Sequence, residues 1–212
     1  MNTDDAIRQR RTEKILSERD LPTVDCQEIV NEILALAGQA PFHRACEESH
    51  RQSGSLDGIE PWRFHVLGAS ACRKLRQKVP CENAGKIPAM LAAADALIMA
   101  TWLPSPSESP STDDELSFAV TLTNMEHIAA VAAAIQTLLL AATARGISNY
   151  WSSGGVLRSR TVLDLLGIAP NEIPLGAIFL FPKEFGNAEL VRSKLRDLRT
   201  PPQSWSRWVT VS

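Results

Sequence analysis

Residues 124–145 have the sequence NMEHIAAVAAAIQTLLLAATAR, and they dictate what the rest of the chain must provide. Between positions 128 and 144 the polar residues are Gln136, Thr137 and Thr143. A helix formed here is therefore apolar around almost its whole circumference and must be covered on every side. The run is short for a bilayer and is rich in alanine, so we predict a buried helix of a soluble protein with no membrane partner. A chain of 212 residues has few other elements with which to bury this helix. A second subunit is an attractive way to cover the rest of its surface.

Strands and helices are predicted on both sides of this helix. Short apolar or alternating runs predict strands at 62–67, 96–103, 147–151 and 175–181. The second of these, ALIMATWL, is apolar throughout and is typical of a central strand buried on both faces. Helical periodicity or stop signals predict helices at 24–37, 69–79 and 158–166. Because helices separate the strands without a regular βαβ cadence, we predict an α+β fold, with a mixed central β-sheet flanked by helices in a single domain over 1–212.

Composition narrows the class of protein. The formal net charge is -2, so there is no overall attraction to nucleic acid and we predict no nucleic-acid partner. The first residues are polar, and Asp4 or Asp5 can cap a short helix running toward Arg11. This start has no apolar targeting segment, and the four cysteines show no CxxC pairing, so we expect a cytoplasmic protein with reduced thiols. The Pro/Ser-rich stretch at 104–116 is predicted to be a mobile surface loop.

Two basic clusters, at 8–14 and 192–199, lie near opposite ends of the chain. Each has an ordinary interpretation, because cations stabilise the C-terminus of a helix and a basic tail is readily solvated. A phosphate site is the alternative. A phosphate monoester is a near-dianion that requires guanidinium groups together with hydroxyl or backbone donors. The two clusters and the Ser-Ser-Gly-Gly turn at 152–155 could supply that set.

The turn at 152–155 follows Tyr150 and Trp151. Glycine lets backbone N–H groups approach a planar ligand closely, whereas a Cβ atom would prevent it. An ordinary turn between a strand and a helix is an equally open interpretation.

A metal site is a weaker hypothesis. His43, Cys46 and His50 could share one helix face, but a structural zinc ion requires four ligands and a fourth is not evident. We interpret these three as surface polar residues and predict no metal.

Taken in order, these segments resemble the nitroreductase family over most of the chain. The most specific block is 124–182, with Asn124-Met-Glu126, Arg145-Gly146-Ile and Trp151-Ser-Ser-Gly154 as its motifs. Arg10-Arg11-Thr12 stands where that family has an Arg-Arg-Ser type motif. Glu60-Pro-Trp62-Arg-Phe64 resembles its Gln-Pro-Trp-x-Phe region, and Lys194-Leu-Arg196 resembles its C-terminal Lys-x-Arg element.

The resemblance implies an intertwined homodimer with FMN at the subunit interface and the extension at 183–212 packed on the partner. It implies that Arg10, Arg11 and Thr12 hold the ribityl phosphate and pyrimidine end, while Lys194 and Arg196 complete the phosphate site. The segment that passes along the isoalloxazine consists of Trp151, Ser152, Ser153, Gly154 and Gly155, with the amide of Gly154 or Gly155 near flavin N5.

The same resemblance implies a ping-pong oxidoreductase in which no side chain is catalytic. NADH or NADPH delivers hydride to flavin N5, and a small electron-poor acceptor such as a nitroaromatic or a quinone then takes the reducing equivalents.

The segment at 42–60 departs from the family pattern. It is longer and more charged, the usual Asn aligns near Asp57 and Gly58, and Glu60 replaces the common Gln. In the family, residues of this region, Glu60 and Trp62 here, contact the flavin from the partner subunit. A carboxylate there disfavours the anionic reduced flavin, although it can accept a hydrogen bond from flavin N3. Two alternatives therefore stay open: the same fold with different flavin chemistry (reductive dehalogenation or flavin fragmentation), and a non-catalytic flavin-binding protein.

Overall fold

The computed structural model describes residues 1–52, 56–80, 84–105 and 118–211. Its strands are β1 (Glu13–Leu16), β2 (Trp62–Gly68), β3 (Ala96–Trp102), β4 (Asn149–Ser152), β5 (Ile173–Leu180) and β6 (Glu189–Arg192). Its α-helices are α1 (Thr3–Gln9), α2 (Gln27–Ala37), α3 (Glu48–Gln52), α4 (Ala69–Lys78), α5 (Ile87–Ala93), α6 (Leu122–Ala144) and α7 (Arg160–Leu165). Three 3-10 helices follow the later strands: η1 (Gly155–Arg158), η2 (Lys194–Leu198) and η3 (Pro202–Ser204). Most of the loop predicted at 104–116 lies outside the described residues.

The central sheet has the strand order β2-β3-β5-β4, and its neighbouring strands are all antiparallel. The prediction of a mixed sheet was therefore wrong for the described residues, although the α+β class is confirmed. The physical reason lies in the register. Ala96 and Asn149, the first residues of β3 and β4, both align with Leu180, so these two strands run the same way. β5 lies between them and is antiparallel to both.

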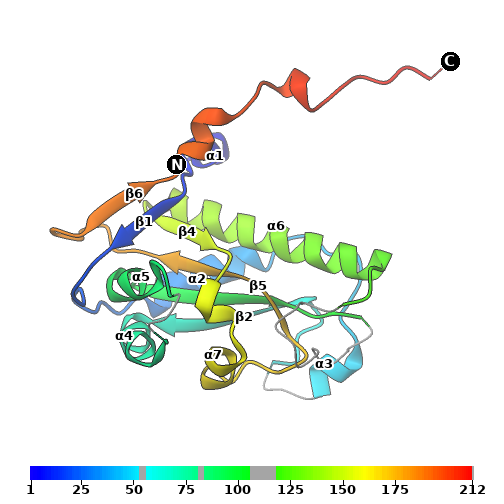
Figure 1. Cartoon of the computed structure of the whole chain (residues 1–212). Coiled ribbons are helices and arrows are strands. Elements are labelled where there is room, and N and C mark those ends of the chain that lie inside the picture. The colour runs from blue at the N-terminus through cyan, green and yellow to red at the C-terminus, as the bar shows by residue number, and fades with distance from the viewer. Residues whose placement is uncertain (53–55, 81–83, 106–117, 212) are drawn as a thin grey trace.

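β3 is the buried centre of the fold, as its apolar run predicts. Every one of its residues is buried. Ile98 and Ala100 belong to the core on one face of the sheet, packed with residues of α2 and α6. Leu97 and Met99 belong to the core on the other face, packed with residues of α4, α5 and α7. Figure 1 shows these helices on opposite sides of the sheet. A strand covered on both faces can be apolar throughout without regard to period.

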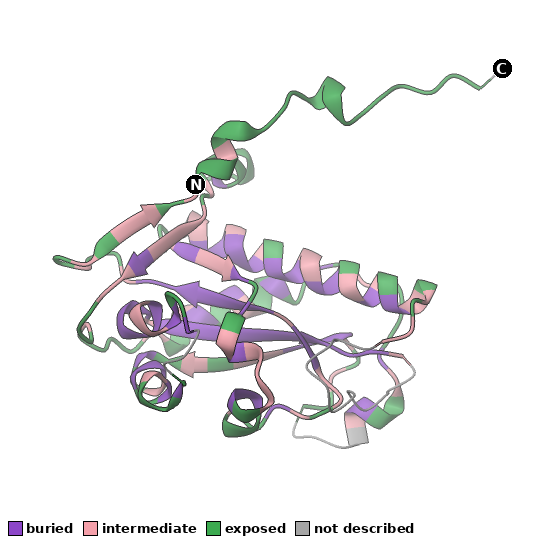
Figure 2. Ribbon diagram, in the orientation of Figure 1, coloured by how far each residue is buried: buried purple, intermediate pink, exposed green. Residues whose placement is uncertain are grey.

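The long helix α6 covers the sheet with one face and leaves the other open (Figure 2). Thr121 caps its start by accepting a hydrogen bond from the Asn124 amide, and it ends before Gly146, whose φ is +71°. By length and composition alone this helix could cross a membrane, and half of its most apolar window is buried inside the protein. Met125 on the open face is 60% exposed. The described residues therefore do not cover this helix on every side.

The two ends of the chain form a second sheet that the sequence did not predict. β1 and β6 pair antiparallel, with Glu13 opposite Arg192. Before β1, the cap of α1 is Asn2, whose side chain accepts a hydrogen bond from the Asp5 amide. The expectation that Asp4 or Asp5 caps this helix was wrong, because both lie inside its first turn. After η2 the tail extends away from the body and is exposed (Figures 1 and 2).

Candidate functional site

The pairing of β1 with β6 brings the two basic clusters together. The Ser193 amide donates to the Thr12 carbonyl over 3.2 Å, just beyond the last pair of the ladder. Arg196 then donates to the carbonyl of Arg10 over 2.5 Å and to that of Arg8. Clusters almost 190 residues apart in sequence thus meet because a short strand ladder positions both.

A pocket of about 240 Å³ opens between these segments. Its lining is mainly arginine, with a hydroxyl group from each strand end: Arg10, Arg11, Thr12, Arg192, Ser193, Leu195, Arg196 and Arg199. We call it the arginine pocket. Four of the five predicted phosphate residues line it, whereas Lys194 does not. Arg192, Ser193 and Arg199 were not predicted, and the basic stretch at 192–199 was the only signal for them.

The arginine pocket carries uncompensated positive charge. Arg192 is paired with Glu13 at 3.0 Å, so it contributes little net charge. Burial lowers the pKa of Arg10, and the neighbouring cations Arg199 and Arg196 lower it further. Guanidinium groups remain protonated in proteins even so, which means that the repulsion among them favours binding of an anion.

The turn after β4 has the conformation that only glycine adopts readily. Gly154 has a φ of +106° and Gly155 a φ of +51°. The Gly154 amide donates to Ser152 Oγ over 3.1 Å, and Arg158 donates to the Ser153 carbonyl over 3.0 Å. Gly155 begins η1, and the first amides of a helix have no acceptor within it. Of the two amides expected near a ligand, that of Gly155 is therefore the less engaged.

Trp151 precedes this turn and is held against the sheet. A Cβ atom on Gly176 of β5 would lie 2.1 Å from Trp151 Nε1. The indole can occupy its place only because position 176 is glycine. Trp151 is half-buried, so part of it stays accessible beside the turn.

Two side chains of β1 contact the segment that leads into the turn. Glu13 at the start of β1 accepts a hydrogen bond from Ser148 Oγ over 2.7 Å, next to the start of β4. One residue further along, the Lys14 ammonium lies 4.5 Å from the ring centroid of Tyr150. β1 therefore runs beside β4, the strand that ends at the turn. The basic cluster at 8–14 includes Lys14, but its contact with Tyr150 was not predicted, because only the tertiary structure places β1 along β4.

These findings agree with a family-level comparison of the sequence, in which a model described as the nitroreductase family matches residues 7–180. The chain belongs to the nitroreductase family. No curated protein matches the sequence.

Solved structures with nitroreductase folds resemble the chain over nearly its whole length. A nitroreductase-like family protein from Bacillus cereus is 19% identical, with a TM-score of 0.63 over 99% of this chain and 96% of the other. A nitroreductase with bound FMN from Bacteroides fragilis is 18% identical, with a TM-score of 0.58 over 99% of this chain and 100% of the other. A nitroreductase family protein from Clostridium novyi NT is 17% identical, with a TM-score of 0.56 over 87% and 86%. At these identities the likeness shows the nitroreductase fold.

Glu60 and Trp62 do not lie with the other predicted residues of this nitroreductase-family chain. Neither lines the arginine pocket. Trp62 is 6% exposed and packs edge-on against Phe42, with 5.6 Å between ring centroids. Glu60 is half-buried in the bend before β2. Their proposed contact with a cofactor depends on a second subunit.

His43, Cys46 and His50 do not form a common cluster. His50 is buried, with Nε2 2.9 Å from the Pro104 carbonyl and Nδ1 3.1 Å from the Asn171 amide. Cys46 is buried as well and donates to the Gly58 carbonyl over 3.5 Å. The interpretation as surface residues was wrong for these two, since Cys46 fixes the loop that contains it and His50 ties α3 to Pro104 and Asn171. Among the described residues no group of three or more His, Cys, Asp or Glu side chains could hold a metal ion.

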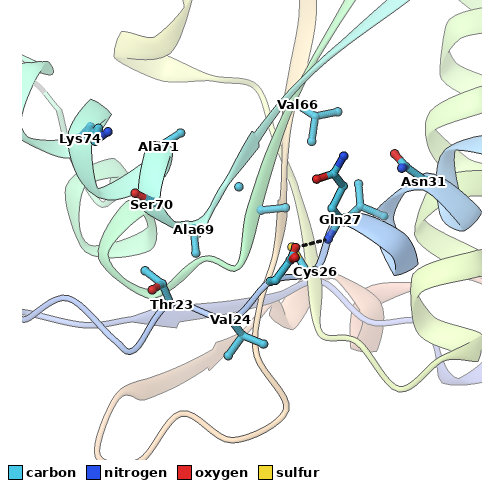
Figure 3. A pocket seen from close by; sticks show the side chains of 14 residues that line it. Thr23, Val24, Cys26, Gln27, Asn31, Val66, Ala69, Ser70, Ala71 and Lys74 are labelled. Atoms are coloured by element: carbon cyan, nitrogen blue, oxygen red, sulfur yellow. Dashed lines mark hydrogen bonds between the residues drawn. The ribbon is translucent and has the colours of Figure 1, made fainter.

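A larger cavity, about 610 Å³, lies beside β2, on the opposite edge of the sheet from β4. In Figure 3, Ser70, Ala71 and Lys74 of α4 lie on one side of it and Gln27 and Asn31 of α2 on the other. Its polar groups are mixed in sign and widely spaced. We assign the functional site to the smaller arginine pocket, because that pocket gathers charge of one sign, whereas volume alone does not select a ligand.

Proposed function

We propose that this protein is an FMN-dependent oxidoreductase that transfers hydride from NADH or NADPH to a small electron-poor acceptor such as a nitroaromatic or a quinone. The observation that carries the proposal is the arginine pocket at the start of β1, together with the glycine turn at 154–155 at the end of the neighbouring strand β4. That arrangement matches a ligand with a phosphate at one end and a planar ring at the other. The FMN bound to the Bacteroides fragilis nitroreductase supports the choice of flavin.

The residues present fit a phosphate monoester at one end of the site. Arg10, Arg11 and Arg196 provide planar donors that suit phosphate oxygens, and Thr12 and Ser193 line the same pocket with hydroxyl groups. Arg199 adds a further cation that sequence analysis did not include. Lys194 does not line the pocket, although its neighbours Ser193 and Leu195 do, so we do not include it among the phosphate residues.

The residues at the other end fit a planar ring. Gly154 and Gly155 have no Cβ, so their backbone can approach a ring face or edge. Ser152, Ser153 and Trp151 surround the same turn, and the Gly155 amide would be the donor nearest the reacting edge. FMN supplies the hydride-accepting atom when bound, while the chain binds the ring, orients it and screens it from water.

We further propose a homodimer in which α6 and the tail supply the contacts. The open face of α6 includes the exposed Met125, and the tail carries Trp205 at 70% and Trp208 at 102% exposure. Exposed apolar groups of this size are typical of protein interfaces. A partner would cover α6, receive the extension at 183–212 and bring its own Glu60 and Trp62 to the flavin.

The first experiment is a visible absorption spectrum of the purified protein, repeated without oxygen after addition of NADH or NADPH. We expect a flavin spectrum that bleaches with at least one nucleotide and returns when a quinone or nitroaromatic is added. A bound flavin that neither nucleotide reduces would contradict the proposed reaction. If the protein is colourless and does not bind added FMN, its likeness to the nitroreductase family concerns the fold alone. That result would also exclude the alternative of a non-catalytic flavin-binding protein.

A second candidate keeps the flavin but changes the reaction to flavin fragmentation or reductive dehalogenation. The observation that favours it is the unusual segment at 42–60, which ends in a carboxylate at Glu60. Exposure of the reduced protein to oxygen, followed by analysis of the flavin, separates the two. A simple reductase returns intact FMN, whereas fragmentation consumes it. Release of halide from a halogenated aromatic would indicate dehalogenation.

A further inference from the structure

The bend at residues 58–60 has no regular secondary structure, yet buried donors fix its backbone. Arg63 donates to the Gly58 carbonyl over 2.8 Å and to the Glu60 carbonyl over 2.9 Å. It also donates to the carbonyl of Trp62 over 2.8 Å. The Cys46 amide donates to the Ile59 carbonyl over 2.9 Å. Every carbonyl from Gly58 to Glu60 is thus held, and Arg63 holds two of them.

Burial of the Arg63 guanidinium group removes a charge from water and therefore costs free energy. Arg63 is 5% exposed. Among the described residues, no carboxylate forms an ion pair with it within 4 Å. A buried charge is tolerated only when its hydrogen-bonding groups are satisfied. Here carbonyl groups of one bend do so, and the planar fork of arginine reaches several of them at once. The guanidinium therefore specifies the shape of the bend.

The Glu60 side chain depends on the same bend. A Cβ atom on Gly58 would lie 2.6 Å from Glu60 Oε2. The Glu60 carboxylate therefore lies beside Gly58, where a Cβ atom at position 58 would displace it. The clamp on the two backbone carbonyls fixes the backbone from which the Glu60 side chain extends, and the missing side chain at position 58 leaves room for its carboxylate.

We infer that Arg63 is a positioning residue that sets the place of the Glu60 carboxylate toward the flavin of the partner subunit. The inference rests on the proposed function, because only there does Glu60 face a flavin. A fixed carboxylate near the ring would disfavour the extra negative charge of the reduced cofactor. The unusual segment at 42–60 would thus lower the affinity for reduced FMN relative to oxidised FMN.

The clamp itself can be tested without flavin, by hydrogen exchange of the backbone amides at 56–62. Arg63→Lys keeps the charge but replaces the fork with a single ammonium group. We expect these amides to exchange about tenfold faster in this variant than in the parent protein. The matched control is Arg44→Lys, an exposed arginine in the same segment that pairs with Glu126. Equal exchange in both variants and the parent would overturn the clamp, whatever the protein binds.

The link to flavin is tested by the ratio of dissociation constants for reduced and oxidised FMN. Glu60→Gln should favour reduced FMN by roughly tenfold, which corresponds to about 30 mV in potential. Gly58→Ala, which displaces only the carboxylate and leaves Arg63 in place, should change the ratio in the same direction. Arg63→Lys alone should also change this ratio in favour of reduced FMN. In a protein that already carries Glu60→Gln, adding Arg63→Lys should change the ratio by less than about twofold.

Two outcomes separate the hypotheses. If Arg63→Lys changes the ratio equally with and without Glu60→Gln, Arg63 does not act through Glu60 and the inference fails. If the parent protein binds no FMN, the proposed function fails and Glu60 loses its role toward flavin. The exchange measurement still decides in that case whether Arg63 clamps the bend.

Discussion

The central sheet and the small sheet at the chain ends differ in almost every physical respect. In the central sheet β3 is buried along its whole length, and its neighbours are chosen by close packing. In the small sheet β6 has no buried residue, and arginines and hydroxyl groups line the pocket at its end, although Ile15 of β1 lies in the core. The first sheet therefore holds the fold together, whereas the end of the second at Glu13 and Arg192 presents charge. Substitutions in the two should separate stability from binding, because a buried contact contributes to folding and a solvated charge contributes mainly to affinity.

The largest effect is expected at Gly176 in the central sheet. A Cβ atom at this position would meet Trp151 Nε1 at 2.1 Å and the Ser152 carbonyl oxygen at 2.8 Å. Gly176→Ala should lower the free energy of unfolding by about 3 kcal/mol, measured by urea denaturation. Gly68→Ala is the matched control, since nothing lies within 4 Å of its added Cβ, and it should change stability by less than about 0.5 kcal/mol. Equal stability of both variants would contradict this view of the sheet.

A somewhat smaller effect is expected at Glu172, which accepts hydrogen bonds from His65 over 2.7 Å and Thr101 over 2.5 Å. Burial alone raises the pKa of Glu172, but these hydrogen bonds lower it below its ordinary value. A lowered pKa means that the carboxylate stabilises the fold above its ordinary pKa and loses this contribution as pH falls through the folded value. Glu172→Gln should cost about 2 kcal/mol at pH 7.

The pH dependence makes that prediction specific. The difference in unfolding free energy between the parent and Glu172→Gln should shrink below about pH 4. The exposed Glu184 provides the control, because Glu184→Gln should alter stability little at any pH. A cost that is constant from pH 7 to pH 3 would indicate a loss of packing and not of a charged acceptor.

The small sheet should show the opposite behaviour. Arg11 is exposed and lines the arginine pocket. Arg11→Gln should weaken FMN binding by about tenfold, or roughly 1.4 kcal/mol, and leave the urea midpoint unchanged. The effect should diminish at high salt because ions screen an exposed charge. Arg207→Gln, in the exposed tail, should leave affinity unchanged. A loss of stability without a loss of affinity would break the division between the two sheets.

The smallest effect is expected at Asp95, just before β3. Burial raises the pKa of Asp95 to about 6, and the neighbouring Arg73 only partly offsets this. Because the folded protein favours the protonated form, the ionised carboxylate lowers stability as pH rises from about 4 to 6. Asp95→Asn should therefore stabilise the protein by about 1 kcal/mol at pH 8, discounted for solvent access, and by almost nothing at pH 4. Thermal unfolding at both pH values, with the exposed Asp57→Asn as control, measures it.

Apolar elements could be predicted from the sequence, whereas short charged strands and the order of the strands could not. Ala96 to Leu103 and the apolar run of α6 were predicted well, because a continuous apolar sequence has no stable place except a core. β1 and β6 were missed, because strands of four residues with charged side chains have no detectable period. The antiparallel order was also missed, since strand order depends on which element enters between β3 and β4.

The candidate site divides in the same way. Arg10, Arg11, Thr12 and Arg196 could be named from charge and spacing, and the glycines at 154 and 155 from the conformations that they allow. The contact of Lys14 with Tyr150 could not be predicted, because nothing local tells which strand β1 will lie beside. Arg63 could not be recognised either, since its partners are backbone carbonyls, which leave no trace in the sequence.

By itself the sequence determined the α+β class, the buried strand at 96–103, the apolar helix and the residue types available for binding a phosphate. These follow from side-chain polarity and backbone freedom, which are local properties. The tertiary structure alone decided that two distant basic clusters share one pocket, that Trp151 lies over Gly176 and that Arg63 fixes the bend that holds Glu60. Those contacts join residues from separate elements, so they form only when the chain folds and cannot be read from any local stretch of sequence.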